Sequence, residues 1–210
     1  MAGSKYWADN YIEIRKSMVE AVSLIRPGQR VFIGSACGEP QALVRTLSEA
    51  APRSSGLEIV RLMSMETTSL TAIANRTLDH SLSVRTIYLG SAREDEIITR
   101  NLRFITPMNM SDAPGLFKTR KLPINVALIQ VSPPDDFGWM SLGISVDVTL
   151  AAAESADLVI AQVNSKMPRV LGQSFIHVND VDVIVEHDED LLAVESAPGK
   201  WELRRMKQQW

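Results

Sequence analysis

The stretch GSACGEP, from Gly34 to Pro40, has the residue types and spacing best suited to chemistry. It holds the only cysteine of the chain and two glycines, which let a backbone turn sharply and let a ligand approach main-chain N–H groups closely. Pro40 suits the first position of a helix, and Glu39 suits the positive end of that helix dipole. Three interpretations follow: a binding loop, a cysteine active site and a tight structural turn.

The surrounding residues weigh against thiol or metal chemistry at this stretch. A cysteine nucleophile needs a base beside it, and the sequence places none of His80, His177 and His187 near Cys37, which favours a small turn residue. Three scattered histidines and one cysteine offer no ligand pair at usable spacing, so we predict no metal site. A phosphate cradle has little support, because no Lys follows and the glycines lie four residues apart.

Other polar segments have simpler explanations. His177 lies in the apolar run SFIHV, which favours a packed, hydrogen-bonded imidazole. The run EHDEDLL, Glu186 to Leu192, is interpreted as a solvated acidic turn after a strand. Methionines near proposed strand ends either line an acyl-binding site or fill gaps in the core: Met63, Met65, Met108 and Met110.

Short apolar runs indicate the elements that position these residues. They are too short for helices and suit strands buried on both faces of a parallel sheet. We expect strands at residues 31–33, 57–63, 83–89, 103–107, 125–131 and 157–163.

Helical patterns alternate with these strands. Apolar residues from Tyr11 to Ile25 recur at three- and four-residue steps and predict one helix, in which Ser17 and Glu20 have capping-box spacing. Further helices are expected from Gln41 to about Ala50 and at residues 148–156. The sequence therefore predicts an α/β fold with a mainly parallel sheet covered by helices on both faces. Two strand-like runs around residues 179 and 180 also predict an antiparallel pair at one edge, near the C-terminus.

In such a sheet, ligands bind at the carboxyl ends of the strands, where loops are free of sheet bonding. Six loops qualify, and each is rich in small, polar or proline residues: 34–40, 64–69, 89–93, 106–114, 132–138 and 164–172.

Composition narrows the class of protein. The 210 residues suit one domain, with 45% hydrophobic and 22% charged residues, as in an ordinary globular protein. A net charge of −3 gives no electrostatic footprint for nucleic acid. No apolar run approaches the roughly 20 residues that cross a bilayer, and the N-terminus lacks the apolar core of a signal peptide. We expect a cytoplasmic protein with no membrane or nucleic-acid partner.

Three longer stretches go beyond a general α/β pattern: GQRVFIGSACGEPQALV from Gly28, INVALIQVSPPDDFGWMSLGISVDVTLAAAESADLVIAQVN from Ile124, and MPRVLGQSFIHVNDVDVIVEHDEDLL from Met167. Together they resemble the N-terminal half of the acetyl-CoA hydrolase/transferase family, which includes acetate and 4-hydroxybutyrate CoA-transferases. The resemblance spans about Met18 to Leu192 and is loosest from Ser54 to Arg120.

The resemblance implies two tandem CoA-transferase-fold domains with the active site between them. A glutamate in the second half would attack the acyl-CoA, so this chain would contribute no catalytic residue. Glu39 is therefore not assigned as the nucleophile. The implied substrates are an acyl-CoA and a small carboxylic acid, with coenzyme A as substrate and no tightly bound cofactor. The residues implied to face the cleft and bind the acid are Ser35, Cys37, Gly38, Glu39, Pro107, Ser111, Ser132, Pro133, Gly138, Ser141, Gly143, Asn164, Met167 and Pro168.

The expected organisation is a domain over residues 1–195, followed by a basic tail or linker start at 196–210. The first hypothesis for function is half of an acyl-CoA transferase or acetyl-CoA hydrolase that is inactive alone and needs a C-terminal domain or second subunit. The alternative is a non-catalytic binding or interaction module for a small carboxylate or CoA ester. A sugar-phosphate isomerase has less support, because no Lys-bearing phosphate loop is present. Surface left uncovered by a missing half predicts a homo-oligomer.

Overall fold

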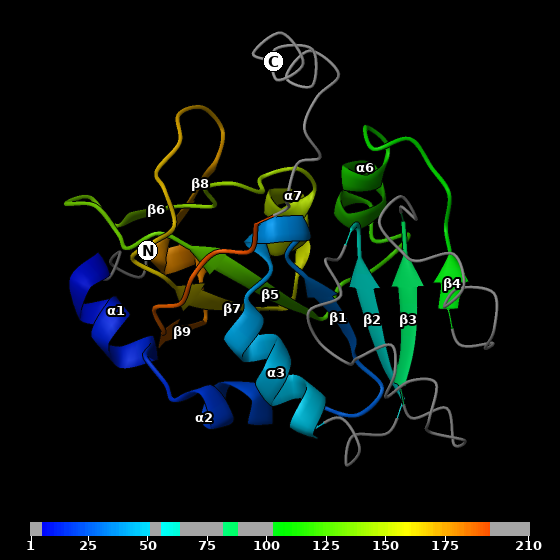
Figure 1. Cartoon of the computed structure of the whole chain (residues 1–210), viewed down its shortest axis with the longest axis horizontal. Helices are drawn as coiled ribbons and strands as arrows, with labels where there is room; N and C mark the ends of the chain where they lie inside the picture. The colour runs from blue at the N-terminus through cyan, green and yellow to red at the C-terminus, as the bar shows by residue number, and fades with distance from the viewer. Residues whose placement is uncertain (1–5, 51–55, 64–81, 88–102, 194–210) are drawn as a thin grey trace, which may run out of the picture.

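A central parallel sheet organises the computed structural model, which describes residues 6–50, 56–63, 82–87 and 103–193 (Figure 1). Its seven strands have the order β4-β3-β2-β1-β5-β7-β9, and every neighbouring pair is parallel. The strands are β1 (Arg30–Ile33), β2 (Leu57–Arg61), β3 (Leu82–Thr86), β4 (Arg103–Ile105), β5 (Val126–Val131), β7 (Leu158–Val163) and β9 (Val183–Glu186). The predicted α/β class with a parallel sheet is confirmed.

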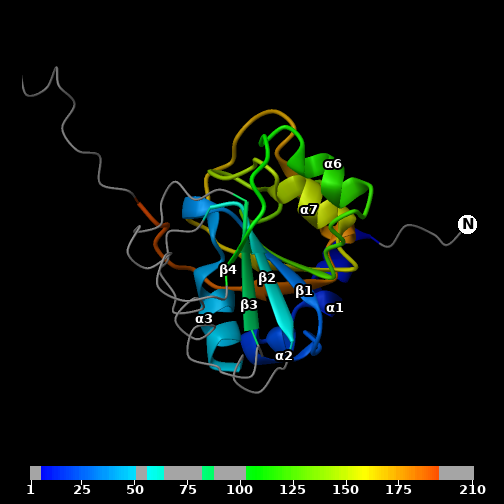
Figure 2. The same ribbon diagram turned by 90° about the vertical axis from the view of Figure 1, so that its right-hand side faces the viewer.

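Helices cover both faces of this sheet, as predicted. Figure 2 shows α2 and α3 on one side of the strands and α6 and α7 on the other. The helices are α1 (Trp7–Ile14), α2 (Met18–Ser23), α3 (Gln41–Ala50), α6 (Ala113–Lys118) and α7 (Thr149–Ser155). Side chains alternate along each strand, so Val31 and Ile33 pack in the core under α2 and α3, whereas Phe32 packs edge-to-face on Phe117 of α6 with ring centroids 5.9 Å apart.

The predicted single helix near the N-terminus is two helices, which corrects the expectation. Ser17 caps the second helix: its hydroxyl accepts the Glu20 N–H at 3.3 Å, and the Glu20 carboxylate accepts the Ser17 N–H at 2.9 Å. Just before this capping box, the Lys16 N–H donates to the Ile184 carbonyl at 2.9 Å. The open edge of β9 therefore accepts a main-chain hydrogen bond from the residues between the two helices. The apolar spacing in the sequence continues across this break and does not reveal it.

The antiparallel pairing near the C-terminus involves other partners than expected. Strand β8 (Phe175–His177) pairs antiparallel with β6 (Trp139–Ser141) in a separate two-stranded sheet, and β9 joins the edge of the main sheet parallel to β7. The 3-10 turn η3 (Val178–Asp180) carries the chain between β8 and β9. Just before β9, Asp182 makes two hydrogen bonds to Val159 of β7. Its carboxylate accepts the Val159 N–H at 2.7 Å, and its own N–H donates to the Val159 carbonyl at 3.1 Å.

Helix α6 was not predicted, because six residues are too few to show a helical period. Helix α3 has the predicted bounds, and α7 lies within one residue of them at each end. In the described ranges, no helix has the length and apolar character that crossing a membrane requires.

Candidate functional site

The loop after β1 folds into a short 3-10 turn, η1 (Ala36–Gly38), at the carboxyl edge of the sheet. Three of its N–H groups already have main-chain acceptors: those of Ala36, Gly38 and Glu39 donate to Met63, Ser35 and Ala36 at 2.9, 2.9 and 3.3 Å. Among the described residues, no acceptor contacts the N–H groups of Ser35 and Cys37. Ser35 is 1% exposed, whereas Cys37 is partly exposed, so the Cys37 N–H is the donor that a ligand at this loop can reach.

The segment after β6 packs tightly against the same loop. A Cβ atom built at Gly38 would lie 2.7 Å from the Ser145 Cβ, which no side chain tolerates, so the glycine is required by close approach. The Ser35 hydroxyl lies 3.2 Å from the Asp147 Oδ1, which also accepts the Thr149 N–H at 3.0 Å. These contacts fix the η1 turn against the start of α7.

Two buried amide side chains link the loop after β1 to β5 and to the loop after β7. The Gln130 Nε2 donates to the Glu39 carbonyl at 2.9 Å, and the Asn164 Nδ2 donates to the Gln130 Oε1 at 2.7 Å. Gln130 and Asn164 are 2% and 0% exposed, so each unmet hydrogen bond here would be costly. We call this pair the amide bridge.

Helix α3 receives its N-terminal cap from distant parts of the chain. Its first main-chain acceptor is Pro40, whose side chain has no oxygen to cap the free N–H groups. Instead the Ala42 N–H donates to the Glu189 carboxylate at 3.0 Å, and the Leu43 N–H donates to the Gln162 Oε1 at 3.3 Å. Interpreting EHDEDLL as a uniformly solvated turn was wrong, because the Glu189 side chain is only 13% exposed. The helix end supplies the compensation that lets this carboxylate be buried.

The excursion between β5 and β6 is held by hydroxyl groups and one arginine. The Ser132 hydroxyl accepts the Ser141 N–H at 2.9 Å, and the Ser141 hydroxyl accepts the Gly143 N–H at 3.1 Å. Arg169 donates to the Pro133 carbonyl at 3.1 Å, to the Trp139 carbonyl, to the Ser132 hydroxyl and to the Asp135 carboxylate. Several predicted site residues are therefore gathered into one hydrogen-bonded unit beside β7.

Asp135 within this unit is held as a carboxylate. Burial raises its pKa, but the N–H groups of Trp139 and Phe137, together with Arg169, outweigh that effect and leave the pKa below its ordinary value. The charge pairs with Arg169 at 2.8 Å.

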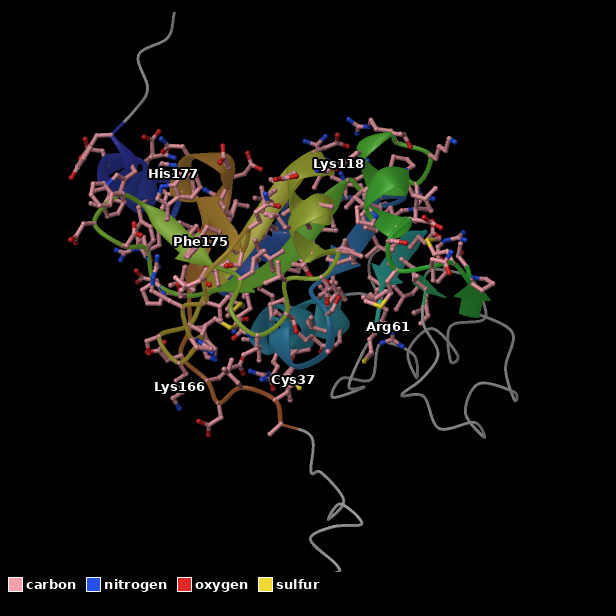
Figure 3. All side chains as sticks on the ribbon, turned by 90° about the horizontal axis from the view of Figure 1, so that it is seen from above. Cys37, Arg61, Lys118, Lys166, Phe175 and His177 are labelled. Atoms are coloured by element: carbon pink, nitrogen blue, oxygen red, sulfur yellow. The ribbon has the colours of Figure 1, made fainter. Side chains whose placement is uncertain are left out.

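The loop after β7 brings two further predicted residues to this edge. Met167 is 2% exposed and packs on Gly143, where a Cβ atom would lie 2.2 Å from the Met167 Sδ. Pro168 follows it and is exposed. In Figure 3, Cys37, Arg61 and Lys166, from the ends of β1, β2 and β7, lie along one side of the molecule, whereas Lys118 and His177 lie on the other.

Three predicted residues lie apart from this group. Pro107 and Ser111 are exposed on the connection from β4 to α6, and no hydrogen bond among the described residues ties them to the loops above. Gly138 faces α1, and a Cβ atom built there would lie 2.6 Å from the Trp7 Cγ. His177 next to it is hydrogen-bonded, as predicted, with its Nε2 2.9 Å from the Phe137 carbonyl. Met65 and the loops at 64–69 and 89–93 lie outside the described residues, as does the expected tail at 196–210.

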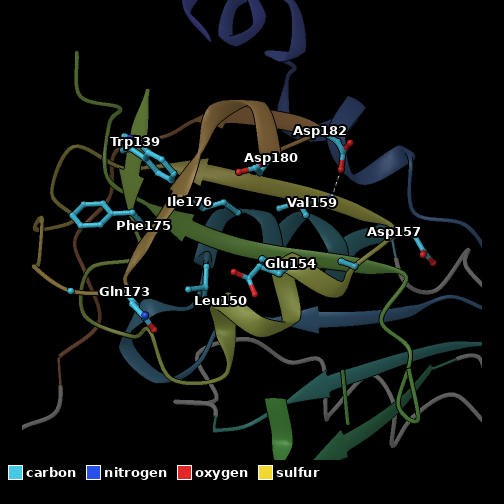
Figure 4. Close-up of a pocket in the computed structure, with 13 residues that line it drawn as sticks. Trp139, Leu150, Glu154, Asp157, Val159, Gln173, Phe175, Ile176, Asp180 and Asp182 are labelled. Carbon is cyan, nitrogen blue, oxygen red and sulfur yellow. Dashed lines mark hydrogen bonds between the residues drawn. The ribbon is translucent and has the colours of Figure 1, made fainter. Parts of the chain in front are cut away.

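A broad groove of about 800 Å³ lies between α7 and β8, away from these loops (Figure 4). None of the predicted site residues lines it. Three of its four acidic groups have partners: Glu154 pairs with Lys118, Asp157 pairs with Arg120, and Asp182 accepts the Val159 N–H, whereas Asp180 is exposed. We interpret the three partnered carboxylates as structural.

A smaller hollow of about 340 Å³ lies at the carboxyl ends of β7 and β9. It is lined by Tyr11, Pro133, Val163, Ser165, Glu186, His187 and Asp188. Burial, followed by the hydrogen bond to Glu186, raises the pKa of Tyr11 far above its ordinary value, so this phenol stays protonated. Within the described ranges, no three His, Cys, Asp or Glu side chains lie close enough together to hold a metal ion.

Sequence reasoning missed the residues that hold the site together, and a signal for two of them was present. Gln130 and Gln162 are the polar members of the apolar runs VALIQV and LVIAQV, and the two residues are in register on β5 and β7. A polar side chain in a strand buried on both faces must have a partner, which predicts a buried network. Arg169 and Glu189 carried no comparable signal, because their partners are distant in sequence.

Comparison with known proteins identifies the family of this chain. The model of the acetyl-CoA hydrolase/transferase N-terminal domain matches residues 4–195. The chain belongs to this family. Within it, the chain is 40% identical over 189 residues to the 4-hydroxybutyrate coenzyme A transferase of Clostridium kluyveri, a match that covers 90% of this chain and 43% of the relative.

Two solved structures share the fold of this chain. The crystal structure of RipA from Yersinia pestis superposes with a TM-score of 0.77 at 29% identity and covers 91% of this chain and 46% of that chain. The 4-hydroxybutyrate CoA-transferase of Porphyromonas gingivalis gives a TM-score of 0.67 at 28% identity and covers 90% and 43%. The chain thus spans less than half the length of these relatives.

Proposed function

We propose that this chain forms the acid-binding wall of a composite acyl-CoA transferase or acetyl-CoA hydrolase site. The observation that carries the proposal is the convergence of the loops after β1, β5 and β7 on one sheet edge: the amide bridge links the first to the third, and Arg169 links the second to the third. The carboxyl ends of parallel strands are where α/β proteins bind ligands, and relatives named as CoA transferases share the fold. The substrates in this proposal are an acyl-CoA and a small carboxylic acid.

The nucleophile in this proposal comes from another domain or subunit. A glutamate carboxylate there attacks the thioester carbonyl and expels the coenzyme A thiolate, which leaves a mixed anhydride. The thiolate then attacks the glutamyl carbonyl, releasing the first acid and forming a glutamyl-CoA thioester. The acceptor carboxylate reverses these two steps and leaves as the new acyl-CoA, whereas water takes its place in a hydrolase.

Residues of this chain bind and orient in this scheme. The Cys37 N–H, which has no acceptor among the described residues, is suited to a carboxylate or to the oxyanion of the acyl group. Glu39 is 3% exposed at the exit of the η1 turn, which suits a packing role better than attack on a substrate. The relatives' greater length supports a partner half, and exposed apolar side chains such as Ile144 and Leu171 support association with it or with a second copy.

The test compares the 210-residue chain alone with the chain supplied with a C-terminal half from a matching relative. Each is mixed with acetyl-CoA and an acceptor acid, either butyrate or 4-hydroxybutyrate, and the new acyl-CoA is measured by chromatography. We expect turnover only with both halves, and a glutamyl-CoA thioester detectable by mass spectrometry on the added half. Turnover by this chain alone, or a thioester on one of its own glutamates, would contradict the proposal.

A further inference from the structure

Glu189 lies on the segment that follows β9, and its side chain differs from its neighbours in burial. The Glu189 side chain is 13% exposed, whereas that of Asp190 is 93% exposed. A carboxylate is buried to this extent only where several donors compensate for its lost hydration.

Three donors from two elements surround this carboxylate. Its Oε1 accepts the Ala42 N–H at 3.0 Å and the Gln162 Nε2 at 2.7 Å, and its Oε2 accepts the Arg45 guanidinium at 2.7 Å. Gln162 is itself 0% exposed in β7. The side chain therefore joins the start of α3 to the interior of the sheet.

The main chain of the same segment holds the neighbouring loop. The Asn164 Nδ2 donates to the Glu189 carbonyl at 2.8 Å as well as to Gln130, so this residue is shared between the segment and the amide bridge. One residue further on, the Asp190 carbonyl accepts the Gln41 Nε2 at 2.9 Å. These contacts lead either to the start of α3 or to the loop after β7.

The start of α3 directly follows the η1 turn, with only Glu39 and Pro40 between them. Displacement of Ala42 therefore moves the turn that carries Cys37, whose N–H has no acceptor among the described residues. Since the Pro40 side chain supplies no cap, the Glu189 carboxylate and the Gln162 Oε1 cap this helix end.

We propose that Glu189 is a positioning residue for the candidate site at the carboxyl edge of the sheet. It holds the η1 turn and the loop after β7, which carries Asn164, in the geometry that binds substrate, without touching the substrate itself. This inference rests on the proposed function for its catalytic consequence, but the positioning itself is testable in this chain alone. Glutamine at this position keeps the shape and an acceptor oxygen for Ala42 and Gln162, whereas alanine removes both.

The first experiment measures the rate at which N-ethylmaleimide modifies Cys37, the only thiol of the chain, which lies in the η1 turn and is partly exposed. We expect Glu189→Ala to speed modification about tenfold, because local opening of the turn becomes easier. Glu189→Gln keeps the acceptor for Ala42 and loses only the ion pair with Arg45, so it should speed modification no more than about two- to threefold. The control Asp190→Asn leaves the contacts of Glu189 with α3 intact and should stay within about twofold of the parent. An unchanged rate in Glu189→Ala would overturn the inference.

The second experiment measures kcat and KM for the acceptor acid after the variants are combined with the C-terminal half. We expect Glu189→Ala to raise KM about tenfold, with Glu189→Gln restoring most of the loss at an unchanged pH profile. If glutamine is as damaging as alanine while Cys37 keeps its parental reactivity, the charge acts on the substrate and positioning is refuted. Absence of turnover in the parent pair would instead count against the proposed function and leave the thiol result standing.

A third variant guards against failure of Glu189→Ala to fold. Arg45→Met removes the ion pair with the same carboxylate, and the Arg45 side chain is 49% exposed. We expect it to speed Cys37 modification two- to threefold, in line with the loss of one partly exposed ion pair. No change in this variant, with Glu189→Ala unfolded, would overturn the inference.

Discussion

Asn164 on the loop after β7 donates its Nδ2 to the Oε1 of Gln130 on β5 at 2.7 Å, although both residues are buried between strands of apolar sequence. Neutral amides satisfy each other there without the desolvation cost of buried charges. Through the Gln130 bond to the Glu39 carbonyl, a pair of side chains sets the spacing between the loops of the candidate site.

Replacing Gln130 by leucine should destabilise the protein by about 1–3 kcal/mol, because the Glu39 carbonyl loses its donor and the Asn164 Nδ2 loses one of its two acceptors in a buried setting. Urea unfolding followed by tryptophan fluorescence measures this difference. The control Gln173→Leu makes the same change at an exposed position and should stay within about 0.5 kcal/mol. Equal stability of the two variants would show that the amide bridge contributes nothing.

A second prediction concerns pH and Glu58, which bridges two arginines on the α6 face of the sheet. Burial raises the Glu58 pKa, but the bonds from Arg85 and Arg30 outweigh it and leave the pKa below its ordinary value. A lowered folded-state pKa gives stability that is present above the unfolded value of about 4.3 and is lost as pH falls through the folded value. The difference in the free energy of unfolding between the parent and Glu58→Gln should therefore be largest near neutral pH and vanish in acid.

The expected size at neutral pH is on the order of 1 kcal/mol, since the side chains of Glu58, Arg30 and Arg85 are still 17%, 24% and 26% exposed. Urea unfolding between about pH 3 and pH 7 measures it. Glu154→Gln, which removes a surface pair with Lys118, should show a much smaller difference over the same range. A constant difference between parent and Glu58→Gln at all pH values would contradict the assignment.

A third prediction separates backbone strain from steric clash at two glycines. Gly143 has φ +60° and a Cβ there would lie 2.2 Å from the Met167 Sδ, whereas Gly172 has φ +98° with no atom within 4 Å. Gly143→Ala should cost about 2–4 kcal/mol, from strain plus overpacking, and Gly172→Ala about 1–2 kcal/mol from strain alone. Thermal unfolding of both variants gives the comparison, and a larger loss at Gly172 would refute it.

How far the sequence predicted this molecule depends on the distance over which each interaction acts. The strand at Val126–Val131 and the helix at Gln41–Ala50 follow from local apolar periodicity, and the capping box at Ser17 follows from residue spacing. The separation of α1 from α2 did not follow, because the open edge of β9, about 170 residues away in the chain, takes up the backbone groups at the break. In the candidate site, the strand pattern predicted the loops and the family resemblance supplied the individual residues, but the partners of Glu189 and Arg169 depend on tertiary placement.

The last prediction concerns Cys37 and tests whether the η1 turn acts through its backbone or its thiol. In the two-part enzyme proposed above, this chain combined with a C-terminal half from a relative, Cys37→Ala should keep turnover within about threefold of the parent, because alanine retains the N–H and the small size. Gly38→Ala, one residue away, should lower kcat/KM at least tenfold, since its Cβ would lie 2.7 Å from the Ser145 Cβ and displace the same N–H. Steady-state kinetics with acetyl-CoA measures both, with circular dichroism to verify folding. Near-total loss of turnover in a folded Cys37→Ala variant would make the thiol, rather than the main chain, the functional group of this loop.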